Sequence, residues 1–226
     1  MRFNVLTAQG VQFQKELTPR RLYLIGYAGR DTAAQQAHIR ELWEQYGIPA
    51  PAKTPSIFIC DACLLTQRSD LHFVGGDTSG EAECVLFLQE GELFVGVGSD
   101  HTDRALESES VPKAKQVCPK PVGGTLWAFD GVRSHWDELQ LSAWIGDGET
   151  ETLYQQGSLA ELLPPGQVLS ELFARAGAID PAAIYCGTVP VIGSIRGAKR
   201  FRCELYDPVL GRRLTCAYRA ETEEAT

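Results

Sequence analysis

The chain has 226 residues, 44% of them hydrophobic, and a formal net charge of -8 at pH 7. A surface of that sign repels phosphate, so it argues against a nucleic-acid or anionic-membrane partner and favours a small metabolite or another protein. The start, MRFNVLTAQG, lacks the apolar core of a signal peptide, and no stretch approaches the roughly 20 apolar residues that span a bilayer. Seven scattered cysteines, an odd number, fit a reducing compartment, and we therefore expect a cytoplasmic protein.

The N-terminal part of the chain predicts short strands and one helix. Asp31 is placed to cap a helix over residues 32–46, and Gly47 with Pro49 ends it. The proline-rich residues that follow predict an ordered loop. Runs of aliphatic and aromatic residues predict strands at 2–6, 10–14 and 20–29.

The rest of the chain is mostly strand in character. Ser158 and Glu161 have the spacing of a capping box, which predicts short helices at 159–163 and 167–176. No internal repeat and no break in composition divides the sequence into two parts. Further strands are predicted at 56–60, 71–75, 84–89, 91–98 and 138–146, and again within 183–193 and 199–220.

Three carboxylates lie at the open end of the hairpin that these strands predict. Side chains at i and i+2 of a strand share a face, so Glu81 and Glu83 project together. After the glycine turn, an antiparallel return brings Asp100 back beside the pair. Hard cations prefer oxygen ligands and keep open positions for a substrate, so such a trio suits Mg²⁺ or Mn²⁺. The alternative is a solvated strand face, with both glutamates in water and Asp100 in a turn.

Other short motifs occur in a fixed order around this hairpin. The segment from Gly96 to Arg104 contains Asp100 and ends in an arginine, and a lysine follows it, for which Lys115 is the best candidate and Lys113 the second. The remaining motifs are His38-Ile39-Arg40-Glu41 on the predicted helix and Gly187-Thr188 near the end of the chain.

The order and spacing of these motifs resemble the fumarylacetoacetate hydrolase superfamily, from about residue 24 to about residue 216. Within it, the sequence is most similar to a divergent prokaryotic branch, the DUF2848 type. Two positions depart from the superfamily pattern, since Ser99 stands in place of Asn and Thr102 in place of Ser. The resemblance implies an α+β, mostly β fold: a mixed β-sandwich roll with a few short peripheral helices.

The sequence predicts a single domain, and the resemblance implies a metal. Residues 1–220 are expected to form a single catalytic domain, in which 1–20 make a small N-terminal β segment, and 221–226 an acidic flexible tail. Glu81, Glu83 and Asp100 would hold Mg²⁺ or Mn²⁺, which would chelate a small 2-oxo acid as a Lewis acid.

Roles for the remaining residues follow from the same resemblance. Lys115 would stabilise an enolate. Arg104 would either bind a substrate carboxylate or pair with Asp103 or Glu107. His38 and Glu41, three residues apart on one helix face, would activate water, although an exposed polar pair is the alternative. The residues expected to touch the substrate are Arg104, Thr188, Gly187 and Tyr27.

Three classes of function are consistent with this sequence. The favoured one is a metal-dependent hydrolase that cleaves a C–C bond of an acylpyruvate-type substrate, with decarboxylation, hydration or isomerisation as alternatives on the same site. The second is a catalytically silent metabolite-binding protein, and the third is a structural or interaction domain whose acidic residues only solvate a strand. A homodimer is expected from the family resemblance alone.

Overall fold

Two β-sheets form the body of the protein, in a computed structural model that describes residues 1–223 without the side chains of His38, Gln45 and Tyr46. Within this part of the chain, eight strands make the larger sheet, in the spatial order β2-β1-β12-β9-β8-β15-β3-β4. Their bounds are β1 Arg2–Leu6, β2 Gln12–Glu16, β3 Arg21–Gly26, β4 Ser56–Asp61, β8 Ala82–Gln89, β9 Glu92–Ser99, β12 Thr125–Ala128 and β15 Ala182–Thr188.

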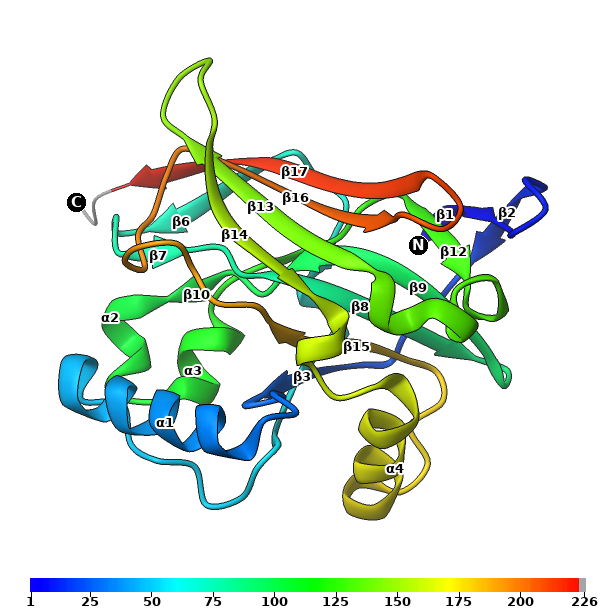
Figure 1. Ribbon diagram of the computed structural model, residues 1–226. Helices are drawn as coiled ribbons and strands as arrows, with labels where there is room; N and C mark the ends of the chain where they lie inside the picture. Colours follow the sequence, from blue (N-terminus) through cyan, green and yellow to red (C-terminus); the bar gives the residue numbers. More distant parts are fainter. Residues whose placement is uncertain (224–226) are drawn as a thin grey trace.

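The smaller sheet has five strands among the described residues, in the order β14-β13-β16-β17-β6, and lies above the larger one in Figure 1. Its strands are β6 Asp70–Val74, β13 Gln140–Gly146, β14 Thr152–Ser158, β16 Arg200–Asp207 and β17 Arg212–Glu223. Two short ladders accompany the sheets, one between β7 Thr78–Ser79 and β10 Thr102–Asp103, the other between β5 Leu65–Thr66 and β11 Lys120–Pro121.

Strand β8 lies at the centre and is buried on both faces. Leu86 belongs to the core that the two sheets share, together with Cys203 of β16. Val85 and Phe87 point the other way, into a second core that contains Tyr185. Because side chains alternate along a strand, Glu83 lies on the same side as Val85. The strand thus carries a carboxylate into a region built from apolar side chains.

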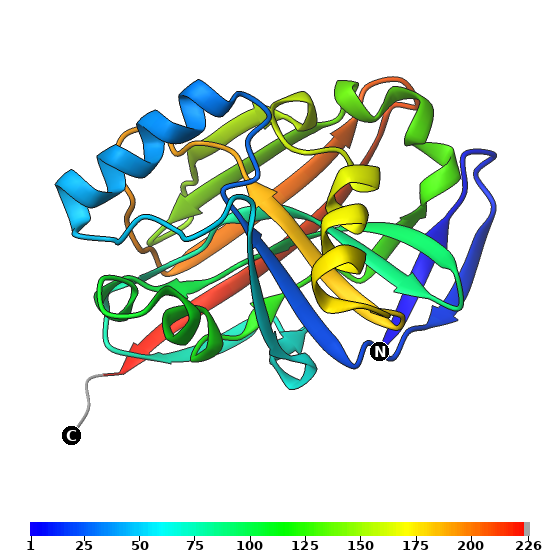
Figure 2. The same ribbon diagram turned by 90° about the horizontal axis from the view of Figure 1, so that it is seen from below.

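Helices lie at the periphery. Helix α1 Thr32–Tyr46 and helix α4 Pro165–Ala176 lie below the sheets in Figure 1 and in front of the strands when the molecule is seen from below (Figure 2). No described helix has the length and apolar character needed to span a bilayer. The remaining helical segments are α2 Arg104–Glu107, α3 Val111–Gln116, and the 3-10 turns η1 Ala62–Leu64, η2 Phe129–Gly131, η3 Arg133–Glu138 and η4 Leu159–Glu161.

The predicted helix over residues 32–46 is confirmed, with its cap. The Asp31 side chain accepts hydrogen bonds from the backbone N–H groups of Ala33 and Ala34, and Gly47 ends the helix at a φ of 68°. The capping box at Ser158 is also present, although it starts a single 3-10 turn rather than a helix to residue 163. The start and end of α1 and the start of the 3-10 turn therefore follow from local sequence chemistry.

Some predicted boundaries are wrong. The strand expected over 20–29 ends at Gly26, because Tyr27 turns the chain with a φ of 53°. Strands β12 and β14 have no counterpart among the predictions. The expected tail is shorter than predicted, since residues 221–223 pair with β6, while residues 224–226 lie outside the described part of the chain. The segment expected at 1–20 forms the β1–β2 hairpin, which joins the larger sheet through β12.

Candidate metal centre

The β8–β9 hairpin brings three carboxylates together. Its register pairs Ala82 with Ser99, and the Asp100 N–H donates a 3.0 Å hydrogen bond to the Glu81 carbonyl oxygen. One carboxylate oxygen each from Glu81, Glu83 and Asp100 lies within 4.8 Å of the others. The antiparallel return expected from the sequence therefore places Asp100 beside the glutamate pair.

The cluster is buried, which contradicts the alternative of a solvated strand face. Glu83 is 3% exposed and Asp100 is 1% exposed, and only Glu81, with 18% of its side chain exposed, approaches the surface. Burial, together with the Asp100 charge, raises the pKa of Glu83 well above its usual value. Because burial disfavours a bare carboxylate so strongly, this position favours a cation nearby.

Two lysines hold Asp100 in its charged form. Lys115 Nζ contacts Asp100 Oδ2, and Lys120 Nζ lies 3.0 Å from Asp100 Oδ1. Burial alone would raise the pKa of Asp100, but the two lysines outweigh it and lower that pKa to about 2. Lys115 Nζ also lies 3.5 Å from Glu81 Oε2, whereas Lys113 of the same helix is exposed. Of the two lysines proposed from the sequence, Lys115 is the one that faces the carboxylates.

Arg104 closes the opposite side of Glu81. Its Nη2 lies 3.2 Å from Glu81 Oε1, and its Nη1 donates a 2.8 Å hydrogen bond to Glu107. A third bond, of 2.7 Å, runs from Nε to the Ser79 hydroxyl. Asp103 is not its partner, because that carboxylate caps helix α2 at Leu106 N–H. Of the two partners considered from the sequence, the structure therefore favours Glu107, with Glu81 added.

Gly187 and Thr188 lie beside Glu83, at an irregular point of β15. The Gly187 N–H donates a 2.7 Å hydrogen bond to Glu83 Oε2. The Thr188 hydroxyl donates to the Ala82 carbonyl at 2.7 Å and accepts a 2.8 Å bond from Gln155 Nε2. Both residues thus orient the strand that carries Glu83, and the Thr188 hydroxyl is engaged within the protein.

The remaining predicted residues lie on the β3–α1 segment. Tyr27 follows β3 and has a backbone in the left-handed region. Burial, and then the charge of Glu107, raise the pKa of its hydroxyl, while Lys115 lowers that pKa and Glu81 raises it. The Tyr27 hydroxyl is therefore influenced by the charged residues of the cluster. Glu41 is on α1 and exposed, while the side chain of His38 lies outside the described residues, so the structure does not place the pair relative to the carboxylates.

Lys120 is a site residue that the sequence did not reveal. It is fully buried and donates to the His101 carbonyl as well as pairing with Asp100. It reaches this position because β11 crosses β9 at Gly98, where a Cβ would lie 2.5 Å from the Pro121 carbonyl oxygen. A lysine between two prolines carries no signal for such burial. Gln155, which also accepts from the Ala82 N–H, was missed for the same reason.

The donor set fits a hard divalent cation. All three candidate ligands are carboxylates, and those of Glu83 and Asp100 are buried. The position of the Lys115 ammonium beside two of the three carboxylates shows that this place already accommodates positive charge. Oxygen ligands at this spacing match the preferences of Mg²⁺ and Mn²⁺.

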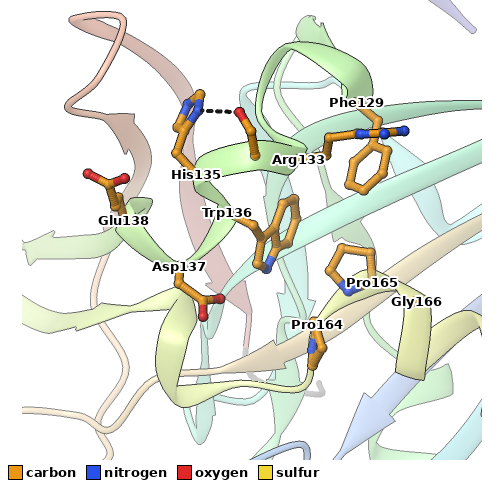
Figure 3. A pocket seen from close by; sticks show the side chains of 10 residues that line it. Phe129, Arg133, His135, Trp136, Asp137, Glu138, Pro164, Pro165 and Gly166 are labelled. Atoms are coloured by element: carbon orange, nitrogen blue, oxygen red, sulfur yellow. Dashed lines mark hydrogen bonds between the residues drawn. The ribbon is translucent and has the colours of Figure 1, made fainter.

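A surface hollow of about 400 Å³ lies elsewhere, between η2, η3 and the start of α4 (Figure 3). His135 and Trp136 line it, and His135 Nε2 lies 3.0 Å from the buried Asp207 carboxylate. None of the residues that line this hollow belongs to the carboxylate cluster.

Similar solved structures share this fold. A 2-keto-3-deoxy-D-arabinonate dehydratase, complexed with magnesium and 2,5-dioxopentanoate, matches with a TM-score of 0.64 and 16% identity over 96% of this chain and 78% of its own. The maleylpyruvate hydrolase of Sphingobium sp. SYK-6 matches with a TM-score of 0.59 and 16% identity over 91% and 72%. The 4-oxalocrotonate decarboxylase of Pseudomonas putida G7, complexed with calcium and acetate, matches with a TM-score of 0.60 and 13% identity over 91% and 78%.

The fold is therefore that of the fumarylacetoacetate hydrolase superfamily, as the motifs predicted. Within that class, a family model described as "Protein of unknown function (DUF2848)" matches residues 25–218, and the chain belongs to this family. No curated protein matches the chain.

Proposed function

We propose that this protein is a divalent-metal-dependent enzyme that acts on a small 2-oxo acid. The observation that carries the proposal is the buried trio of Glu81, Glu83 and Asp100, whose oxygens lie within 4.8 Å of one another and are flanked by Lys115 and Arg104. The names of structures with this fold give further support, since they mention magnesium, calcium and small oxo acids. Buried carboxylates beside buried cations are typical of sites that bind and polarise an anion.

Glu81, Glu83 and Asp100 would hold Mg²⁺ or Mn²⁺. When bound, the cation supplies Lewis acidity toward the carboxylate and keto oxygens of a 2-oxo acid. The protein's own part is to fix the ligands. Gly187 N–H orients the Glu83 carboxylate, and Lys120 orients that of Asp100 from the side away from Lys115.

The cationic residues would stabilise the charge that develops on the substrate. Breaking a bond next to the keto group leaves an enolate, and the Lys115 ammonium is placed beside the carboxylates where that charge would arise. Arg104, which Glu81 and Glu107 hold in place, would bind a substrate carboxylate with its planar guanidinium group. Tyr27 and the backbone at Thr188 are the proposed further substrate contacts. His38 and Glu41 are the proposed pair that activates water.

The favoured reaction is the hydrolysis of an acylpyruvate. Water adds its oxygen to the acyl carbonyl, the C–C bond breaks, and its electron pair goes to the pyruvate enolate, which takes up a proton at carbon. The products are a carboxylic acid and pyruvate. Decarboxylation, hydration or isomerisation of a related 2-oxo acid would use the same enolate, and the formation of both pyruvate and a second carboxylic acid from one substrate distinguishes hydrolysis from these.

We further propose that residues 1–220 act as one catalytic domain and that the protein works in the cytoplasm as a homodimer, without a nucleic-acid or membrane partner. A net charge of -8 repels anions in general, so a small anionic substrate requires positive charge at the site itself. Arg104, Lys115 and Lys120 provide that charge.

Calorimetry with Mg²⁺ and Mn²⁺ tests this function, with oxalate as a mimic of the enolate. The wild type should bind the cation, oxalate should strengthen that binding, and Glu83→Gln should abolish it. Glu109→Gln is the matched control, because Glu109 is an exposed glutamate outside the cluster. If neither the wild type nor Lys115→Met, which removes the ammonium beside Asp100, binds the cation, the metal-enzyme proposal is ruled out and only the similarity of fold remains.

A further inference from the structure

The Lys115 ammonium lies where a metal would have to bind. Its Nζ contacts Asp100 Oδ2 and lies 3.5 Å from Glu81 Oε2, so it contacts two of the three carboxylates that converge within 4.8 Å. Lys115 is buried, with 8% of its side chain exposed. A divalent cation bound by the same oxygens would come within a few ångströms of this charge, where like charges repel strongly in a buried site.

The other cations of the cluster do not share this conflict. Lys120 approaches Asp100 through the other oxygen, Oδ1, and is also anchored on the His101 carbonyl. Arg104 approaches Glu81 through Oε1 and is anchored on Glu107 and Ser79. Lys115 contacts the other oxygen of each carboxylate, Asp100 Oδ2 and Glu81 Oε2.

We propose that Lys115 is the resident counter-ion of the carboxylate cluster and is displaced from it when a divalent cation binds. The inference rests on the metal site of the proposed function. It makes cation binding an exchange: the carboxylates give up the ammonium, which carries one positive charge, and take the metal, which carries two.

The surroundings of Lys115 allow this movement. The residue is near the end of α3, a helix of six residues, and a lysine side chain has four flexible carbons, so its charge moves without the helix moving. The ring of Phe58, 5.9 Å from Nζ, offers a face for the displaced ammonium. An ammonium released from Asp100 is then free to meet a substrate anion. Lys115 would therefore reach the substrate only in the metal-bound enzyme.

Metal affinity of a lysine variant tests the exchange directly. Lys115→Met removes the competing charge and keeps an unbranched side chain, so it should bind Mg²⁺ about tenfold more tightly than the wild type, or better, by calorimetry. Lys113→Met is the matched control on the same helix; Lys113 is exposed, and its loss should leave the affinity unchanged. Circular dichroism confirms that each variant is folded.

A measurement on the wild type covers the case in which Lys115→Met does not fold. Acetylation of lysines at fixed pH, read residue by residue by mass spectrometry, should show higher labelling of Lys115 with Mg²⁺ than without, and equal labelling of Lys113.

The outcomes separate this inference from the proposed function. Tighter binding to Lys115→Met, or binding to that variant when the wild type binds none, supports the exchange. Equal or weaker binding to Lys115→Met, or Lys115 labelling that Mg²⁺ leaves unchanged, overturns the exchange while the metal site stands. Cation binding to neither protein overturns both.

Discussion

The backbone N–H of Gly187 donates a 2.7 Å hydrogen bond to the buried carboxylate of Glu83, across the irregular pairing of β15 and β8. The two residues are far apart in sequence, yet the bond sets the direction of a proposed metal ligand. It depends on a backbone that other residues adopt with difficulty, since Gly187 has a φ of 94° and a Cβ there would lie 2.7 Å from that of Ala28. The geometry of the cluster is therefore controlled from a neighbouring strand.

Replacing this glycine should disturb both stability and metal binding. Gly187→Ala forces a side chain into the left-handed region and against Ala28, and we expect it to lower the free energy of unfolding by about 1–3 kcal/mol. The carboxylate of Glu83 would lose its donor, so Mg²⁺ affinity should fall as well. Thermal unfolding and calorimetry measure the two effects.

Gly148→Ala is the control for this substitution, because Gly148 has nothing within 4 Å of a Cβ position and no positive φ. It should leave both quantities near the wild-type values. An unchanged Mg²⁺ affinity in folded Gly187→Ala would show that this hydrogen bond does not orient the ligand.

Asp100 gives stability a specific dependence on pH. Its pKa is lowered from 3.8 to about 2 in the folded protein, so it contributes stability that is fully present above pH 3.8 and is lost as pH falls toward 2. The shift corresponds to about 2 kcal/mol. Asp100→Asn should therefore be less stable than the wild type by at least about this amount at pH 7, since Lys115 and Lys120 would lose a buried partner. The difference between the two proteins should shrink as pH approaches 2.

Denaturant unfolding from pH 7 to pH 2 follows this difference. Glu109→Gln serves again as the control, because Glu109 is exposed and lies outside the carboxylate cluster. A gap between wild type and Asp100→Asn that stays constant over the whole range would contradict the assignment of the pH dependence to this carboxylate.

The surface hollow of Figure 3 leads to a prediction about stability alone. Behind it, the Asp207 carboxylate is fully buried, lies 3.0 Å from His135 Nε2 and accepts a 3.0 Å hydrogen bond from Arg212 Nε. Asp207→Ala leaves the arginine without its buried partner, and we expect a loss of about 3 kcal/mol. Mg²⁺ affinity of the folded variant should be unchanged, since none of these residues touches the carboxylate cluster. A change in that affinity would show that the two regions are coupled.

The parts of the site that the sequence predicted are those fixed by local rules. The period of two along a strand places Glu81 and Glu83 together, and the glycine turn returns Asp100 to them. Lys120 could not be predicted, because its burial depends on β11 passing over Gly98, a contact between segments with no local signature. The sequence could not decide between Asp103 and Glu107 as partners of Arg104 for the same reason. In the structure Asp103 caps a helix, and Arg104 pairs with Glu107 and Glu81.

In the fold, too, the elements set by local sequence rules were predicted, and those set by distant contacts were not. The helix over 32–46 has an aspartate cap and a glycine stop, and it was predicted at its observed bounds. Strand β14 was missed, because its residues Gln155, Gln156 and Gly157 break the apolar pattern. The structure explains the first of these, as Gln155 is buried and bonds to Ala82 and Thr188. Its polar side chain forms hydrogen bonds beside the carboxylate cluster and does not follow the alternating pattern of a strand.

Glu83 itself makes the sharpest test, because stability and metal binding should move in opposite directions. Burial, with the nearby Asp100 charge, raises the pKa of Glu83 above 4.5, so ionising it costs free energy in the folded protein. A group of this kind favours the folded state below pH 4.5 and loses that advantage as pH rises through the folded pKa. Glu83→Gln keeps an oxygen to accept from Gly187 N–H and removes the charge.

In the absence of metal, Glu83→Gln should therefore be more stable than the wild type at pH 7, by about 1 kcal/mol or more, and this gain should vanish below pH 4.5. With excess Mg²⁺ the order should reverse, because the cation stabilises only the protein that binds it. Thermal unfolding at pH 4 and pH 7, with and without Mg²⁺, gives all four values. A variant that is less stable than the wild type at pH 7 without metal would mean that the charged carboxylate is held by its neighbours and does not need a cation.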